Sequence, residues 1–145
     1  MKIVILLLLL PFNIFAAFTT LSTQQVQAKI TQGVTIIDVR RQDEYNKYGI
    51  ISGAHKMTFF DAKGQYNAQQ WLDNLAKVLP NKNAEFILVC AHANRTKTIG
   101  HFLNTKTAYK NIFELDGGIN YGWIDKGLAT TKIASRTDAP WYQFW

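Results

Sequence analysis

Cysteine is almost absent from this chain of 145 residues, in which Cys90 is the only one. A single cysteine excludes a disulfide within the chain, so the fold must rest on its hydrophobic core, for which this length suffices. The sequence also has no internal repeat, and no low-complexity segment beyond its N-terminus. Charged residues make up only 18% of the chain and apolar residues 48%. That balance is typical of a globular domain rather than a disordered chain.

Dense runs of basic residues are missing as well, although the formal net charge is +6. The lysines and arginines are spread along the chain. This pattern favours small anionic molecules as partners and argues against nucleic-acid binding. We expect neither a metal nor a cofactor.

The longest apolar run is too short to cross a membrane. Lys2 precedes the eight apolar residues Ile3–Leu10, and Pro11 then interrupts the run before the small residue Ala17. A basic start, a short apolar run and a small-residue end are typical of a secretory signal peptide, whereas a membrane span needs about 20 apolar residues. We expect residues 1–17 to be cleaved, which lowers the net charge to +5 and leaves a periplasmic or secreted protein without membrane attachment. An uncleaved anchor is the alternative.

The remaining chain alternates short strands with helices. The pattern predicts strands at 34–39, around 54–57, at 86–89 and at 111–115. It predicts helices after a capping box at Ser22–Gln25, at 44–48, through 71–78, at 95–109 and at 119–126. Such alternation predicts an α/β fold, in which a central parallel sheet of about five strands has helices on both faces.

The stretch around Cys90 carries the chemistry. Phe86–Val89 is continuously apolar and predicts a buried strand, so Cys90 stands where that strand ends. Ligands bind at the carboxyl ends of parallel strands. A helix beginning near Arg95 would direct its first N–H groups and its positive dipole end at the sulfur, which favours an accessible thiolate nucleophile. The alternative is an inert, buried thiol.

Four motifs in this order resemble the rhodanese (single-domain sulfurtransferase) family over about residues 21–128. They are the strand end Ile36-Ile37-Asp38-Val39-Arg40; Glu44-Tyr45 with Gly49-Ile50-Ile51-Ser52-Gly53-Ala54; the loop Cys90-Ala91-His92-Ala93-Asn94-Arg95-Thr96, similar to Cys-x-x-Gly-x-Arg-Ser/Thr; and Leu115-Asp116-Gly117-Gly118 with Trp123. Ile50 replaces a histidine of the family pattern, and Ala93 replaces the loop glycine. If that loop position needs a positive φ, alanine is strained there by about 1 kcal/mol.

The resemblance implies a rhodanese-like domain at residues 18–129, followed by a tail at 130–145. It implies that Cys90 takes sulfane sulfur from a small anionic donor such as thiosulfate, forms a persulfide, and passes the sulfur to a thiol or cyanide. A protein is a further possible acceptor. The residues expected to bind substrate are the rest of the loop: Ala91, His92, Ala93, Asn94, Arg95 and Thr96.

Several residues keep a second interpretation. Arg95 either holds the anionic donor or pairs with a framework acid, for which Asp38 is a candidate. His92 either contacts the anion or faces solvent without a role. Asp38 and Arg40 are expected to form a structural ion pair or hydrogen bonds rather than to catalyse.

Two other functions remain on this fold. A non-enzymatic rhodanese-like binding module is favoured by Ala93 and by the aromatic C-terminus, Pro140-Trp141-Tyr142-Gln143-Phe144-Trp145. A phosphatase is disfavoured, because the resemblance implies that related phosphatases have a loop one residue longer than the segment from Cys90 to Arg95.

Overall fold

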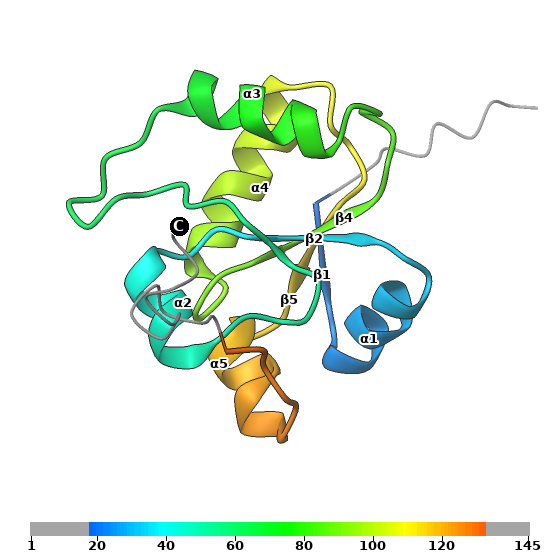
Figure 1. Cartoon of the computed structure of the whole chain (residues 1–145). Coiled ribbons are helices and arrows are strands. Elements are labelled where there is room, and N and C mark those ends of the chain that lie inside the picture. Colours follow the sequence, from blue (N-terminus) through cyan, green and yellow to red (C-terminus); the bar gives the residue numbers. More distant parts are fainter. Residues whose placement is uncertain (1–17, 133–145) are drawn as a thin grey trace, which may run out of the picture.

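Five parallel strands form the centre of the molecule (Figure 1). The computed structural model describes residues 18–132. The strands are β1 (Thr19–Leu21), β2 (Thr35–Asp38), β3 (His55–Lys56), β4 (Phe86–Val89) and β5 (Ile112–Leu115). Their order across the sheet is β1-β5-β4-β2-β3, and every pairing is parallel. The predicted fold class, a parallel α/β sheet of about five strands, is confirmed.

Four of these strands lie where the sequence pattern predicts them. The fifth, β1, was not predicted. It is three residues long and lies at the edge of the sheet, where it pairs only with β5, and its register joins Thr19 to Phe113. A short edge strand whose partner is far away in sequence gives no periodic signal of its own.

The helices are α1 (Thr23–Thr31), α2 (Gln42–Tyr48), α3 (Ala68–Val78), α4 (Asn94–Lys106) and α5 (Gly118–Gly122), with a 3₁₀ turn, η1, at Ile124–Lys126. The capping box at Ser22 and Gln25 is present. The single helix predicted at 119–126 is wrong, because Trp123 leaves the helical region at φ −132° and ψ −63°. The predicted end of α4 at residue 109 is three residues too late, since Thr107 is extended.

Two apolar layers hold the helices on the sheet. One face carries α3 and α4, with Trp71, Leu75, Ile99 and Leu103 in its core. The other carries α1 and α5, and Figure 1 shows this pair on the opposite side of the strands from α3 and α4. Because side chains alternate along β4, Leu88 and Cys90 lie on the α4 face and Ile87 and Val89 on the other.

Residues 130–131, near the end of the described chain, contact the segment that follows α2. Ile50 and Thr131 form an antiparallel bridge, with both N–H groups donating across it, and the Thr130 hydroxyl donates to the carbonyl of Tyr48. The predicted signal peptide at 1–17 and the aromatic residues 140–145 lie outside the described residues. Within residues 18–132, no helix is both long and apolar enough to cross a bilayer.

Candidate active site

The loop that begins at Cys90 joins β4 to α4 at the carboxyl end of the sheet. Two backbone N–H groups of α5 donate hydrogen bonds to the start of this loop. The N–H of Ile119 donates to the carbonyl of Cys90 at 2.8 Å, and the N–H of Asn120 donates to the carbonyl of Ala91 at 3.1 Å. Gly118 makes this approach possible, since a Cβ at that position would lie 2.5 Å from the Cys90 carbonyl oxygen. The predicted place of Cys90 at a strand end before a helix is confirmed.

The side chain of Cys90 is buried, and the residue is only 1% exposed. The expectation of an accessible thiol is therefore wrong for this conformation. Strand alternation explains it, because Cys90 continues the row of Phe86 and Leu88 on the face that α4 covers. Its Sγ lies 3.6 Å from the Thr96 hydroxyl oxygen in the first turn of α4.

Ala93 adopts the left-handed conformation, with φ 61° and ψ 6°, immediately before α4. It is the only residue other than glycine with a positive φ within 18–132, and it is 3% exposed. The loop position that resembles the family glycine thus does need a positive φ, and alanine bears a strain of about 1 kcal/mol there. Of the other loop residues, Ala91 is buried and Asn94 is exposed.

Arg95 extends to α2, where it forms a two-pronged ion pair with Glu44. Its Nη1 and Nη2 atoms donate to the two carboxylate oxygens at 2.8 and 2.6 Å. Asp38, the acid suggested as its partner, is the wrong one. Burial acts to raise the pKa of Glu44, but the hydrogen bonds from Arg95 and from the Arg41 backbone hold it at about 2. Glu44 in turn raises the pKa of Arg95, and the negative charge of a Cys90 thiolate adds to that effect.

Asp38 pairs instead with Arg40, which confirms the expected structural ion pair. Arg40 Nη2 lies 2.7 Å from Asp38 Oδ2 and also donates to the Gly49 carbonyl, and the two side chains are 0% and 1% exposed. Burial raises the pKa of Asp38, and the Arg40 contacts offset only part of this. Within the described chain, Arg40 Nη1 has no hydrogen-bond partner.

His92 is the exposed tip of the loop. Its ring lies 4.8 Å from that of Tyr121, at an angle of 34°, and its Nε2 is 2.9 Å from the Asn120 side-chain nitrogen. The loop therefore brings Cys90 and Thr96 together inside, while His92 and Arg95 face other partners.

Sequence reasoning gave no role at this site to two carboxylates: Glu44, which it named only within the Glu44-Tyr45 motif, and Glu114. Glu114 on β5 is 0% exposed, and Thr96 donates to its Oε2 at 2.5 Å. The available signal was its place in the predicted strand at 111–115, where it is two residues from Ile112 and hence on the same face.

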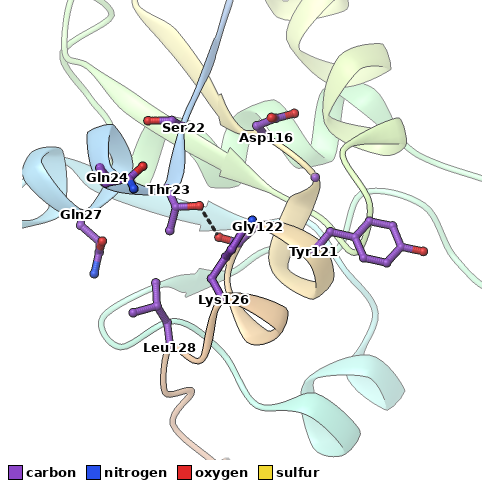
Figure 2. Close-up of a pocket in the computed structure, with 10 residues that line it drawn as sticks. Ser22, Thr23, Gln24, Gln27, Asp116, Tyr121, Gly122, Lys126 and Leu128 are labelled. Atoms are coloured by element: carbon purple, nitrogen blue, oxygen red, sulfur yellow. Dashed lines mark hydrogen bonds between the residues drawn. The ribbon is translucent and has the colours of Figure 1, made fainter.

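Two open cavities are lined by residues outside this loop. The larger, of about 550 Å³, lies between α1 and α5 and is lined by Ser22, Thr23, Gln24, Gln27, Asp116, Gly117, Tyr121, Gly122, Lys126 and Leu128. Figure 2 shows the Thr23 hydroxyl donating to the Gly122 carbonyl across its wall, at 2.7 Å. The second, of about 440 Å³, lies between residues 58–67 and α3. Residues 90–96 line neither cavity, and residues 18–132 hold no group of three His, Cys, Asp or Glu side chains that could bind a metal ion.

The fold and the loop define an α/β domain with a cysteine-led loop at the amino end of a helix. A family model described as the rhodanese-like domain matches residues 22–125, and the chain belongs to that family. A comparison with curated proteins gives no match.

Solved structures share this fold. The thiosulfate sulfurtransferase from Pseudomonas aeruginosa aligns with a TM-score of 0.64 and 21% identity, over 82% of this chain and 21% of that one. The polysulfide-sulfur transferase homodimer from Wolinella succinogenes gives 0.61 and 21%, over 84% of each chain. A rhodanese-like domain from Anabaena gives 0.58 and 25%, over 83% of this chain and 85% of that one.

Proposed function

We propose that this protein is an exported sulfurtransferase that carries sulfane sulfur as a persulfide on Cys90. One observation carries the proposal. Cys90 is the first residue of a six-residue loop that ends at Arg95, at the carboxyl end of β4 and the amino end of α4. Membership of the rhodanese-like family and the sulfurtransferase names of two structural neighbours support it.

The loop provides what a persulfide carrier needs. The first turn of α4 presents N–H groups without helical partners, and the positive end of its dipole favours negative charge on the sulfur. The Thr96 hydroxyl is within hydrogen-bond distance of the sulfur. In the reaction, the Cys90 thiolate attacks the outer sulfur of thiosulfate, the S–S bond breaks, and sulfite leaves with the electron pair. An acceptor thiolate or cyanide then attacks the outer sulfur of the persulfide and releases the Cys90 thiolate.

Burial of Cys90 sets a condition on this chemistry. With 1% exposure, the sulfur meets a donor only when the loop from residue 90 to 95 moves. The Arg95–Glu44 pair holds the end of that loop to α2, so its opening is part of sulfur loading. A guanidinium released from Glu44 matches the oxygens of an anionic donor.

The proposals of export and of an anionic donor have separate grounds, which are the N-terminal sequence and the net charge. The N-terminal apolar run supports secretion, and the net positive charge supports a small anionic donor. A small thiol or a protein thiol is the proposed acceptor, and the proposal includes neither nucleic acid nor, once residues 1–17 are cleaved, a membrane as a partner.

A turnover assay tests the proposal. Purified protein mixed with thiosulfate and cyanide should form thiocyanate, and Cys90→Ser should abolish it. The control variant is Glu85→Gln, an exposed residue just before β4, at the opposite end of that strand from the loop, which should retain the wild-type rate. Turnover that persists in Cys90→Ser, or none with thiosulfate or polysulfide as donor, would overturn the proposal.

A binding module without enzymatic activity is the second candidate, and the burial of Cys90 is the observation that favours it. It predicts that Cys90→Ser leaves binding to partner proteins unchanged while no sulfur is ever loaded. Loss of binding in that variant counts against the module.

A further inference from the structure

A buried carboxylate stands on the same face of the sheet as Cys90. In the register of the strands, Glu114 of β5 pairs with Leu88 of β4 on one side and with Thr20 of β1 on the other. Leu88 continues the row to Ile37 of β2. Glu114 therefore lies between Thr20 and the apolar Leu88 in a row beneath α4, and it is 0% exposed.

Among residues 18–132, the side-chain groups that donate to this carboxylate are two hydroxyls. Thr96 donates to Oε2 at 2.5 Å and Thr20 donates to Oε1 at 2.7 Å. Across residues 18–132, Glu114 forms no ion pair with a lysine, an arginine or a histidine. Burial of a carboxylate without a cation is unfavourable, so packing alone does not account for an acid at this position.

The same Thr96 hydroxyl connects this acid to the nucleophile. Its oxygen lies 3.6 Å from Cys90 Sγ on one side and 2.5 Å from Glu114 on the other. A hydroxyl has a single proton. When Thr96 donates that proton to the Glu114 carboxylate, its oxygen is left to accept from the Cys90 S–H. The three groups therefore form two hydrogen bonds in series, from the thiol to the hydroxyl and from the hydroxyl to the carboxylate.

We infer that Glu114 receives the proton of the Cys90 thiol through Thr96, and so generates the thiolate inside a site that excludes water. The inference rests on the proposed function of Cys90. It makes Glu114 a positioning residue, since it reaches the sulfur only through Thr96.

The transfer balances without any further reactant. The S–H bond of Cys90 breaks as a new O–H bond forms on Thr96, while the original Thr96 proton passes to Glu114 Oε2. The charge of the three groups together stays at −1. After sulfur has been transferred to the acceptor, the released Cys90 thiolate takes a proton back from Thr96, which recovers one from Glu114.

The two ends of this hydrogen-bonded series have different surroundings. Glu114 contacts the neutral Thr20 of β1 and Thr96 of α4, and lies beside the apolar Leu88 of β4. Arg95 is the cation that interacts with Cys90, and it is itself paired with Glu44. The effect of Glu114 on the pH dependence of Cys90 reactivity can therefore be measured by replacing Glu114 while the Arg95–Glu44 pair stays unchanged.

The test is the pH profile of Cys90 alkylation by iodoacetamide, a neutral reagent, in wild type and Glu114→Gln. If Glu114 takes the proton, the wild-type rate has a component that stays flat between about pH 6 and 7.5, because the proton moves within the site rather than to solvent. Glu114→Gln loses this component, so its rate rises about tenfold per pH unit in that range and is at least about tenfold below wild type at pH 6. Above about pH 9.5 the two rates converge.

Thr96 and a matched control complete the design. Thr96→Val should reproduce the steep profile, and Thr96→Ser, which keeps the hydroxyl, should restore the flat component. Glu85→Gln removes an equal charge from an exposed ion pair with Lys29 and should leave the profile unchanged. Thermal unfolding of each variant establishes that it is folded.

Three results would overturn the inference: equal profiles in wild type and Glu114→Gln, a uniform fall at every pH, or a faster reaction in Glu114→Gln. A uniform fall assigns Glu114 a structural role, and a faster reaction means that it holds Cys90 as the thiol. Alkylation does not require sulfur transfer. A steep profile in Glu114→Gln combined with no sulfur loading from any donor would therefore refute the proposed function and leave this inference standing.

Discussion

Glu44→Gln should weaken the fold at neutral pH and remove one specific part of its acid sensitivity. Glu44 joins α2 to the first turn of α4 through Arg95, with contacts of 2.8 and 2.6 Å. The substitution keeps the size of the side chain but removes its charge. The guanidinium of Arg95 is then left half-buried beside a neutral amide.

The size of the effect follows from the pKa of Glu44, which lies at about 2 in the fold against an ordinary 4.5. That difference corresponds to at most about 3 kcal/mol of unfolding free energy. The side chains of Arg95 and Glu44 retain 22% and 13% exposure, so solvent screens part of the interaction. We expect a loss of about 1–3 kcal/mol.

The pH dependence has a definite sign. Because the pKa is lower in the folded state, the stabilisation is complete above about pH 4.5 and is lost as the pH falls toward about 2. The difference in stability between wild type and Glu44→Gln should therefore be constant near neutral pH and shrink below about pH 4.5.

Urea unfolding followed by tryptophan fluorescence at about pH 7, 5 and 3 measures this difference. The control is Glu85→Gln, whose exposed ion pair with Lys29 should contribute less than about 1 kcal/mol. The reasoning fails if Glu44→Gln loses as much stability on acidification as wild type does, or if the two proteins are equally stable at neutral pH.

Two further substitutions test the loop and its support. Ala93→Gly should change the unfolding free energy by less than about 1 kcal/mol, because the relief of strain is offset by the lost buried methyl group and by the freer unfolded chain. Ala93→Val should cost at least about 2 kcal/mol, because a β-branched side chain fits a positive φ poorly. Equal stability of these two variants in urea would contradict the strain at φ 61°. Gly118→Ala should cost more than about 2 kcal/mol, since its Cβ would lie 2.5 Å from the Cys90 carbonyl oxygen, while Gly33→Ala, with φ 80° and nothing within 4 Å, should cost only about 1 kcal/mol. Similar unfolding midpoints for the two alanine variants would mean that the contact beneath Cys90 is not tight.

Local sequence signals were sufficient for much of the fold. Phe86–Val89 was predicted with the bounds that the structure has, because a buried parallel strand is continuously apolar. The capping box at Ser22 marked the start of α1. The strand β1 escaped prediction because its pairing with β5 is a contact between distant parts of the chain.

The contacts within the site were less accessible to sequence reasoning. That Ala93 lies at a loop position with a positive φ could be expected from the resemblance to a glycine motif. The partner of Arg95 could not, because the choice between Asp38 and Glu44 depends on how α2 packs against α4. The burial of Cys90 likewise depends on which face of the sheet α4 covers, and the residues around Cys90 do not specify that face.

Intact-mass measurement of the purified protein before and after exposure to thiosulfate tests the central claim most directly. The account predicts a gain equal to one sulfur atom, mapped by peptide analysis to Cys90, removed by a thiol reductant and absent in Cys90→Ser. An unchanged mass with thiosulfate and with polysulfide, in protein whose Cys90 still reacts with iodoacetamide, would contradict it.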